Sequence, residues 1–295
     1  MAQKYPSTLD LLRVYYNNLI TRFFLFWSIF GGKLSKKLQI PLTKQKTGLI
    51  VISHADDLLL SCGAATLALL DDGWKIHVIR VTDDRWDSWG FDEAETIRRN
   101  KSEFDEVLAS LGINSLSEFG YPTDTLGDKS EVSLRNQLVK VIREIRPYLV
   151  MSFDPDSIKF EDNQDHVLVG KAVAEACWTA GFDKHPDGKV DQLAPHLPIE
   201  KWYFGRVVVE ETHFLDITDY QDRLIELISL HRTMISNMVA QASLQAEFLG
   251  YSLEQIRENP KIFVELLVRS RESEKYRIIG PERINQLIKE FGVEI

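Results

Sequence analysis

The sequence contains little cysteine, and its cysteines are not paired. Only Cys62 and Cys177 occur in 295 residues, and each falls in a segment with a helical pattern. There is no CxxC pair and no regular cysteine spacing, which argues against a disulfide framework or a cysteine-based zinc site. We therefore expect a protein of a reducing compartment, the cytoplasm.

Long apolar runs are also lacking. The N-terminal segment, residues 1–47, has an uninterrupted apolar run only over residues 23–27, far short of the roughly 20 residues that a membrane-spanning helix needs. No small-residue cleavage site follows it, so a cleaved signal peptide fits poorly. Two interpretations of the aromatic residues in this N-terminal segment stay open. They pack against the domain or a second subunit of a homo-oligomer, or residues 15–37 contact a membrane surface peripherally.

Positive charge is scarce after residue 47. The first 47 residues contain eight Lys or Arg and one acid, which leaves 27 basic and 43 acidic residues in the rest of the chain. An acidic body without a basic face argues against nucleic-acid binding. The basic residues of the N-terminal segment favour the membrane interpretation, because each contributes up to about 1 kcal/mol near anionic lipid.

From residue 48 the sequence alternates short β-rich runs with longer helical patterns. Strands are predicted over residues 48–53, 74–82, 117–121, 148–153 and 202–210, and helices over 58–72, 91–111, 131–146 and 166–180. This alternation predicts an α/β fold, a Rossmann-like and mainly parallel sheet flanked by helices. We expect a catalytic domain over residues 48–235, between the N-terminal segment and a helical C-terminal extension over 236–295.

Metal-binding residue types follow two of the predicted strands. His54, Asp56 and Asp57 come after the first strand, and the stretch DPDSIKFEDNQDH after the fourth ends in His166. Ligands of open α/β sheets bind beyond the carboxyl ends of the strands. His54 and Asp57 are three residues apart, so one turn of chain can aim both at one point. A histidine from the second loop would complete a three-ligand set with an open position, as in catalytic zinc sites.

Two other interpretations of this cluster stay open. The paired acids could be a helix N-cap with its first turn, and Asp165 could be a second N-cap. Two histidines and a carboxylate also suit non-haem iron oxygenases, although the βαβ context and a neighbouring free carboxylate favour hydrolytic zinc. In the zinc interpretation, Asp56 is not a ligand and would take a proton from the attacking water.

The same residues resemble a known family, the LmbE-like or PIG-L de-N-acetylases. A strand is followed by HADD, then by the helix CGAATLALLDDGW, and later by VIRVTDD, GYPTDTL, IRPYLVMSFDP and NQDHVLVGKAVAEAC. The resemblance covers residues 48–235. It implies that each chain holds one zinc ion, or one ion of another divalent transition metal. The ligands would be His54, Asp57 and His166. It also implies that Asp56 is the general base.

The sequence departs from the family pattern at several positions. Ala55 stands for the usual proline and Leu58 for the usual glutamate. Asn163 stands where the family has a histidine that stabilises the oxyanion or passes a proton. An asparagine amide can donate a hydrogen bond to an oxyanion but cannot act as a general acid. Asn100 stands where the family often has an arginine, directly after Arg99.

Four further residues are predicted to contact the substrate. Trp86 and Trp89 follow the second strand and could stack on a sugar ring, although loop tryptophans also simply bury area. Arg99 directly precedes position 100, where the family often has an arginine. His231 lies where family members often have a histidine near the rim, and the alternative is a surface histidine on a helix.

The metal-site pattern predicts a hydrolase, and the resemblance implies that it removes an N-acyl group, N-acetyl in the family, from an amino sugar or glycoconjugate. The substrate would be a small molecule or a lipid-linked amino sugar. Two alternatives stay open. One is an amidase acting on a conjugate without a sugar. The other is a metal-holding scaffold or partner-binding protein without turnover, for which Asn163 and Leu58 are the motivating residues.

Overall fold

The computed structural model describes residues 35–186 and 193–291. Most of the aromatic N-terminal segment therefore lies outside the described residues, and so does its expected contact with a membrane or a second subunit. Among the described helices, none has the length and apolar character needed to cross a membrane.

Within the described ranges the chain forms one mixed sheet of eight strands, in the order β1-β7-β8-β6-β5-β2-β3-β4. Strand β8 is antiparallel to both of its neighbours, and the other pairs are parallel. The strands are β1 (Lys36–Lys37), β2 (Thr47–Ile52), β3 (Lys75–Thr82), β4 (Leu116–Tyr121), β5 (Leu149–Phe153), β6 (Glu200–Phe204), β7 (His213–Asp216) and β8 (Ser273–Ile279). The predicted α/β class is confirmed.

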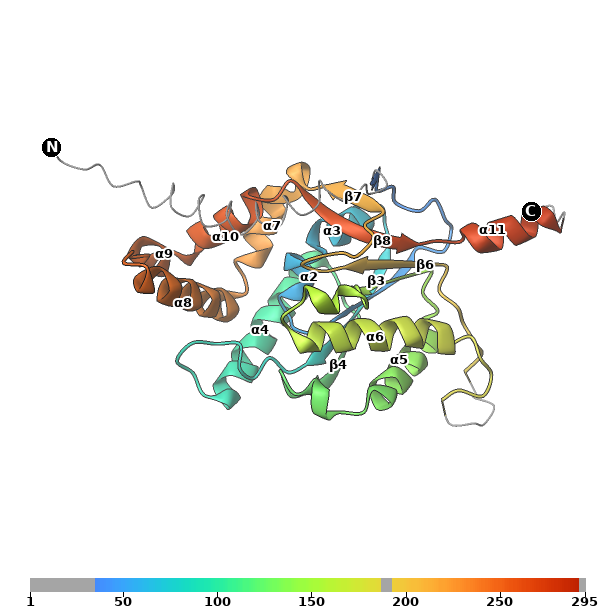
Figure 1. Ribbon diagram of the computed structural model, residues 1–295, viewed down its shortest axis with the longest axis horizontal. Coiled ribbons are helices and arrows are strands. Elements are labelled where there is room, and N and C mark those ends of the chain that lie inside the picture. The colour runs from blue at the N-terminus through green and yellow to red at the C-terminus, as the bar shows by residue number, and fades with distance from the viewer. Residues whose placement is uncertain (1–34, 187–192, 292–295) are drawn as a thin grey trace.

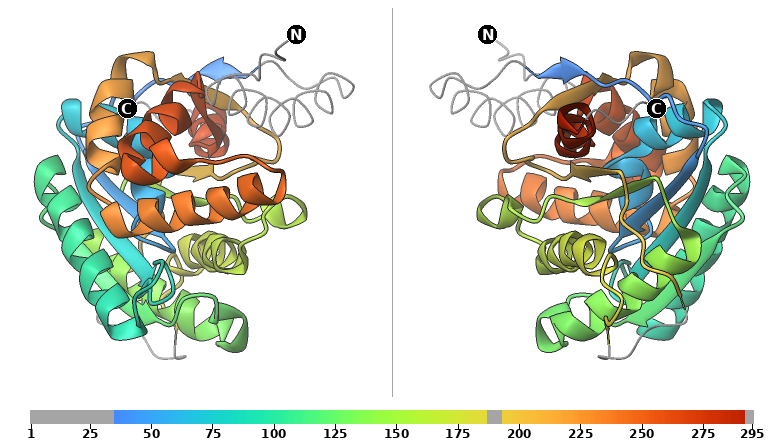
Figure 2. Two further views of the ribbon diagram at one scale, coloured as in Figure 1. Left: turned by 90° about the vertical axis from the view of Figure 1, so that its left-hand side faces the viewer. Right: turned by 90° about the vertical axis from the view of Figure 1, so that its right-hand side faces the viewer.

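Helices cover both faces of this sheet (Figures 1 and 2). Because both faces are covered, β5 is buried along its whole length and β2 along all but its first residue, as expected for central parallel strands. Helices α5 and α6 pack side by side, and α4 contacts α8. The helices are α2 (Asp57–Leu60), α3 (Gly63–Asp71), α4 (Glu93–Leu111), α5 (Glu131–Ile145), α6 (Gln164–Thr179), α7 (Gln221–Ile228), α8 (Arg232–Phe248), α9 (Glu254–Glu258), α10 (Pro260–Arg269) and α11 (Glu282–Glu290).

The order of the parallel strands creates a switch point between β2 and β5. From β2 the chain moves outward to β3 and β4, then crosses back to β5 and continues to β6 on the other side. The loops that follow β2 and β5 therefore diverge to opposite faces of the sheet and leave a crevice at its carboxyl edge. These are the two loops that carry the predicted metal ligands.

Three local predictions differ from the structure. The strand predicted over residues 202–210 ends at Phe204, the last residue of β6. The helix predicted over residues 58–72 is two helices, α2 and α3, interrupted at Ser61 and Cys62. The C-terminal extension over residues 236–295, expected to be helical, also contains β8, which inserts between β6 and β7. The C-terminal extension thus contributes to the same sheet as the catalytic domain. Strand β8 was missed because four of the seven residues in its sequence, SEKYRII, are polar, so it does not form an apolar run.

Strand β8 also explains why the helix is interrupted. The carboxylate of Glu274 accepts hydrogen bonds from the backbone N–H groups of Ala64 at 2.7 Å and Ala65 at 3.0 Å, and from the Tyr276 hydroxyl at 2.6 Å. Glu274 is only 4% exposed. A buried carboxylate at the N-terminus of α3 satisfies two backbone donors that the helix itself cannot pair.

We predict that Glu274→Ala destabilises the protein by about 3 kcal/mol, because it leaves two buried N–H groups without acceptors at about 1–3 kcal/mol each. Denaturant unfolding measures the change. Glu272→Ala, at an exposed position of the same segment, is the matched control and should be nearly neutral. Equal stability of the two variants would contradict this role for Glu274.

Candidate metal centre

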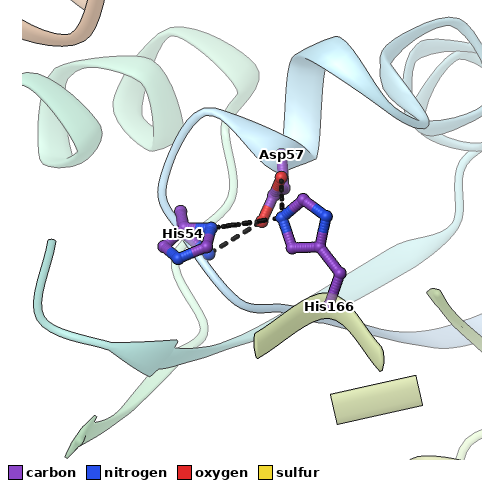
Figure 3. A group of neighbouring side chains, drawn as sticks. All are labelled: His54, Asp57 and His166. Carbon is purple, nitrogen blue, oxygen red and sulfur yellow. Dashed lines mark hydrogen bonds and ion pairs between the residues drawn. The ribbon is translucent and has the colours of Figure 1, made fainter. Parts of the chain in front are cut away.

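Three side chains converge at the switch point from two segments of the chain, the one after β2 and the one after β5. His54 lies in the turn after β2, Asp57 is the first residue of α2, and His166 is in the first turn of α6. His54 Nδ1 lies 3.2 Å from His166 Nε2 and 3.4 Å from Asp57 Oδ2, and His166 Nε2 lies 3.2 Å from Asp57 Oδ1. Figure 3 shows both rings directed at the Asp57 carboxylate.

Local structure fixes these positions. The backbone N–H of His54 donates to Asp57 Oδ2 at 2.8 Å, which closes the turn on itself. Helix α6 lies close against β5 because Gly170 has no side chain: a Cβ there would be 2.8 Å from the Phe153 carbonyl oxygen. The Phe153 ring stacks on the His166 ring, with centroids 4.0 Å apart.

The outer nitrogen of each ring faces a second carboxylate. His54 Nε2 lies 3.6 Å from Asp165 Oδ2, and His166 Nδ1 lies 3.3 Å from Glu161 Oε2. Neither contact has the alignment of a full hydrogen bond. Metal-binding histidines commonly have a carboxylate in this outer position.

The electrostatics favour a positive charge between the three residues. Burial opposes protonation of His54, but the carboxylates of Asp165 and Asp57 raise its pKa well above the ordinary value. Burial likewise opposes protonation of His166, yet Asp57 raises its pKa to about 9. Burial would raise the pKa of Asp57, and the two imidazoles lower it below its usual range. A cation would replace these protons.

These residues fit a divalent metal. One ligand atom from each of His54, Asp57 and His166 lies within 4.8 Å of the others, and all three residues are buried. Two neutral imidazoles and one carboxylate, with an open fourth position, are the donor set of catalytic zinc. Each ring would bind a metal as the tautomer that carries its hydrogen on the outer nitrogen, because the lone pair then lies on the inner nitrogen.

Asp56 lies beside this group without joining it. It precedes α2 but makes no side-chain capping bond, so the N-cap interpretation does not account for its carboxylate. It is 7% exposed. Burial, and next the Asp57 carboxylate, raise the pKa of Asp56 to about 8. A carboxylate with this affinity for protons is suited to accept one.

Asn163 has a structural role in addition to its predicted catalytic one. It is the N-cap of α6, and its Oδ1 accepts from the backbone N–H of Asp165 at 2.9 Å. Asp165 is therefore not the cap. Its carboxylate instead accepts from the backbone N–H groups of Asp124 at 2.7 Å and Leu126 at 3.3 Å. The amide NH₂ of Asn163 remains available to donate.

A cavity of about 340 Å³ lies at this end of α6, lined by Asp124, Asp162, Asn163, Gln164 and Arg206. Its volume is within the usual range for small-molecule sites. It adjoins the metal-binding group, because a carboxylate oxygen of Asp124 lies within 4.8 Å of a ring nitrogen of His54. The cavity is lined by polar side chains, which suits a hydroxyl-rich ligand.

The four predicted substrate contacts differ in position. Trp86 and Trp89 are about half exposed on the loop after β3, so their rings are available. The Arg99 side chain is held on the surface of α4 by Glu95 at 2.6 Å and by the Phe91 ring.

His231 does not lie at the rim. It is fully buried, stacked on Phe104, and burial with nearby Arg80 lowers its pKa to about 4. Because its side chain is buried, His231 is not a surface histidine, and it has no exposed atoms with which to contact a ligand in this conformation.

Three acids near the site were given no role at the metal centre from the sequence. Glu161 and Asp165 stand behind the two histidines, and both lie in the acidic stretch already noted for its final His166. Asp87 has a buried, unpaired Oδ2 and a pKa raised to about 7 by burial. Only their position shortly after predicted strands could have indicated these acids, since nothing in their spacing marks them as partners of a histidine.

Known proteins are similar to this chain in sequence and in fold. Residues 49–177 match the PIG-L family model, described as GlcNAc-PI de-N-acetylase, which confirms the resemblance predicted from the sequence. A probable N-acetyl-alpha-D-glucosaminyl L-malate deacetylase 2 of Bacillus anthracis is 28% identical over 147 residues, 50% of this chain and 61% of that relative. The chain thus matches less than two thirds of the length of that relative.

Solved structures are similar over more of the chain. The N,N'-diacetylchitobiose deacetylase of Pyrococcus horikoshii has a TM-score of 0.65 and 18% identity, covering 95% of this chain and 96% of that chain. The 4-carboxy-2-hydroxymuconate hydratase GalB of Pseudomonas putida KT2440 has a TM-score of 0.51 and 20% identity, covering 80% and 97%. At these identities the likeness concerns the fold alone, which serves more than one reaction.

We predict that purified protein contains about one divalent metal ion per chain and that Asp57→Ala loses most of it. The substitution removes a ligand and also the acceptor that holds the His54 backbone. Elemental analysis after dialysis measures the loss. Asp162→Ala, whose side chain is 97% exposed, is the control and should keep its metal. Full metal content in Asp57→Ala would exclude this ligand set.

Proposed function

Because residues 49–177 carry a PIG-L family domain, we propose that this protein is a zinc-dependent hydrolase that removes an N-acetyl group from an amino sugar or glycoconjugate. The observation that carries the proposal is the convergence of His54, Asp57 and His166 beside the free carboxylate of Asp56. The chain is similar to amino-sugar deacetylases both in sequence and in fold.

In this proposal His54, Asp57 and His166 hold the metal. When bound, a divalent cation supplies a Lewis acid that polarises the amide carbonyl and acidifies a water molecule. Asp56 takes the proton from the attacking water and returns it to the leaving nitrogen. No histidine stands at position 163 to share these transfers, so one carboxylate performs both.

Asn163 stabilises the negative charge that develops on the carbonyl oxygen. Its Oδ1 is engaged by the backbone N–H of Asp165, which directs the NH₂ group of the same amide toward the cavity that Asn163 lines. A fixed donor aimed at a developing oxyanion contributes to catalysis without reorganisation. The helix cap thus orients a catalytic donor.

The proposed substrate has a polar group next to the acetamido sugar. The cavity beside the site is lined by polar residues, and the exposed rings of Trp86 and Trp89 offer flat apolar faces for a sugar. The proposed substrates include both free and lipid-linked conjugates. The described site would recognise the amide and the sugar, which the two kinds of conjugate share. Membrane contact through residues 15–37 and homo-oligomer formation stay predictions from the sequence.

Two observations favour specific rivals. Asn163 in place of a histidine suits a metal-binding protein without turnover. The similarity in fold to a hydratase suits a reaction on a substrate without an acetamido group. Both rivals predict that the zinc-loaded protein leaves N-acetylglucosamine conjugates intact, which distinguishes them from the proposed deacetylase.

We predict that Asp56→Asn retains the metal but lowers turnover of an N-acetylglucosamine conjugate by about 10²–10⁴-fold, the usual contribution of a general base. Amine release gives the rate, and elemental analysis confirms that both proteins carry the same metal. Unchanged turnover would assign the base to another residue. No turnover by the wild-type protein would refute the deacetylase.

A further inference from the structure

Glu161 is a buried acid with an unusual set of neighbours. It lies in the loop between β5 and α6, is 5% exposed, and has its Oε2 3.3 Å from Nδ1 of His166. His166 directs its other nitrogen, Nε2, at the proposed metal position, 3.2 Å from Asp57 Oδ1. Glu161 therefore stands directly behind a proposed ligand.

The two oxygens of Glu161 have separate partners. Oε1 accepts from the backbone N–H of Asn163 at 3.0 Å and lies 3.7 Å from Nε of Arg206. Oε2 faces His166, its partner among the described residues. The first oxygen anchors the side chain, and the second is left to face the imidazole.

The corresponding carboxylate behind His54 is arranged differently. Both oxygens of Asp165 accept backbone N–H groups, those of Asp124 and Leu126, and its contact with His54 is longer, at 3.6 Å. Asp165 therefore organises the loop after β4 as well as facing a ligand. Glu161 has the shorter contact and one oxygen without such a competing donor.

A carboxylate in this position has two effects on a metal-binding imidazole. Its negative charge favours the tautomer with hydrogen on Nδ1, which places the lone pair on Nε2, and the same charge makes the ring a stronger donor to the metal. We propose that Glu161 is a positioning residue that orients His166 toward the metal and raises metal affinity, with Arg206 and the Asn163 backbone holding Glu161 in place. The inference rests on the proposed metal centre.

Zinc affinity of the intact protein tests this role. Apo-protein is titrated with Zn²⁺ against a chelator of known affinity, without substrate. Glu161→Gln keeps an acceptor for the Asn163 backbone but removes the charge, and its zinc dissociation constant is expected to rise about 10–100-fold. Asp162→Asn removes the same charge from a neighbouring exposed side chain that also faces Arg206, and it should bind zinc as the wild type does.

A third variant separates charge from loop packing. Glu161→Asp retains the carboxylate on a shorter side chain and is expected to bind zinc more tightly than Glu161→Gln. Thermal unfolding of the apo-proteins checks that each variant is folded, and Glu161→Asp carries the test if Glu161→Gln is not. If Glu161→Asp binds zinc no more tightly than Glu161→Gln, the retained negative charge contributes nothing to the affinity, which overturns the proposal.

Other outcomes separate this inference from the proposed function. Wild-type zinc affinity in Glu161→Gln, or equal weakening in Asp162→Asn, overturns the role of Glu161 and leaves the deacetylase intact. A wild-type protein that binds zinc without cleaving acetamido sugars refutes the deacetylase, while the affinity difference still supports Glu161. A wild-type protein without zinc affinity overturns both.

Discussion

The close approach of His54 and His166 is the constraint on which the site depends. Their facing nitrogens lie 3.2 Å apart beside the buried carboxylate of Asp57. In the absence of a metal, the carboxylates raise the pKa of both rings despite their burial, so two groups that favour the charged form face each other. A single divalent cation removes this conflict, because it replaces the protons and is attracted by all three residues.

The rest of the structure holds that approach in place. The β2–β5 switch point brings the two loops together, and Gly170 lets α6 come close enough to β5 for His166 to reach the crevice. Glu274, from the far end of the chain, caps α3, the second helix after the HADD turn. Buried carboxylates on distant segments thus stabilise the geometry of the site, and their desolvation is offset by backbone N–H donors.

Much of this could be predicted from the sequence. The alternation of apolar runs and helical patterns predicted the parallel core, and the position of His54, Asp57 and His166 after two strands placed them at one edge. Glu161 and Glu274 could not be predicted in the same way. Their partners are brought together only by tertiary packing: Glu274 contacts a helix some 210 residues away in the chain. Charge alone does not distinguish a buried acceptor from a solvated surface acid.

Anomalous diffraction at the zinc edge, from crystals of the zinc-loaded protein, tests the central claim most directly. The account predicts one strong peak per chain within about 2.0–2.2 Å of His54 Nδ1, His166 Nε2 and an Asp57 oxygen, the usual zinc–ligand distances. The Asp56 carboxylate should lie outside this coordination shell. A peak at another position, or ligation by Asp56 in place of Asp57, would contradict the assignment of metal ligands and base.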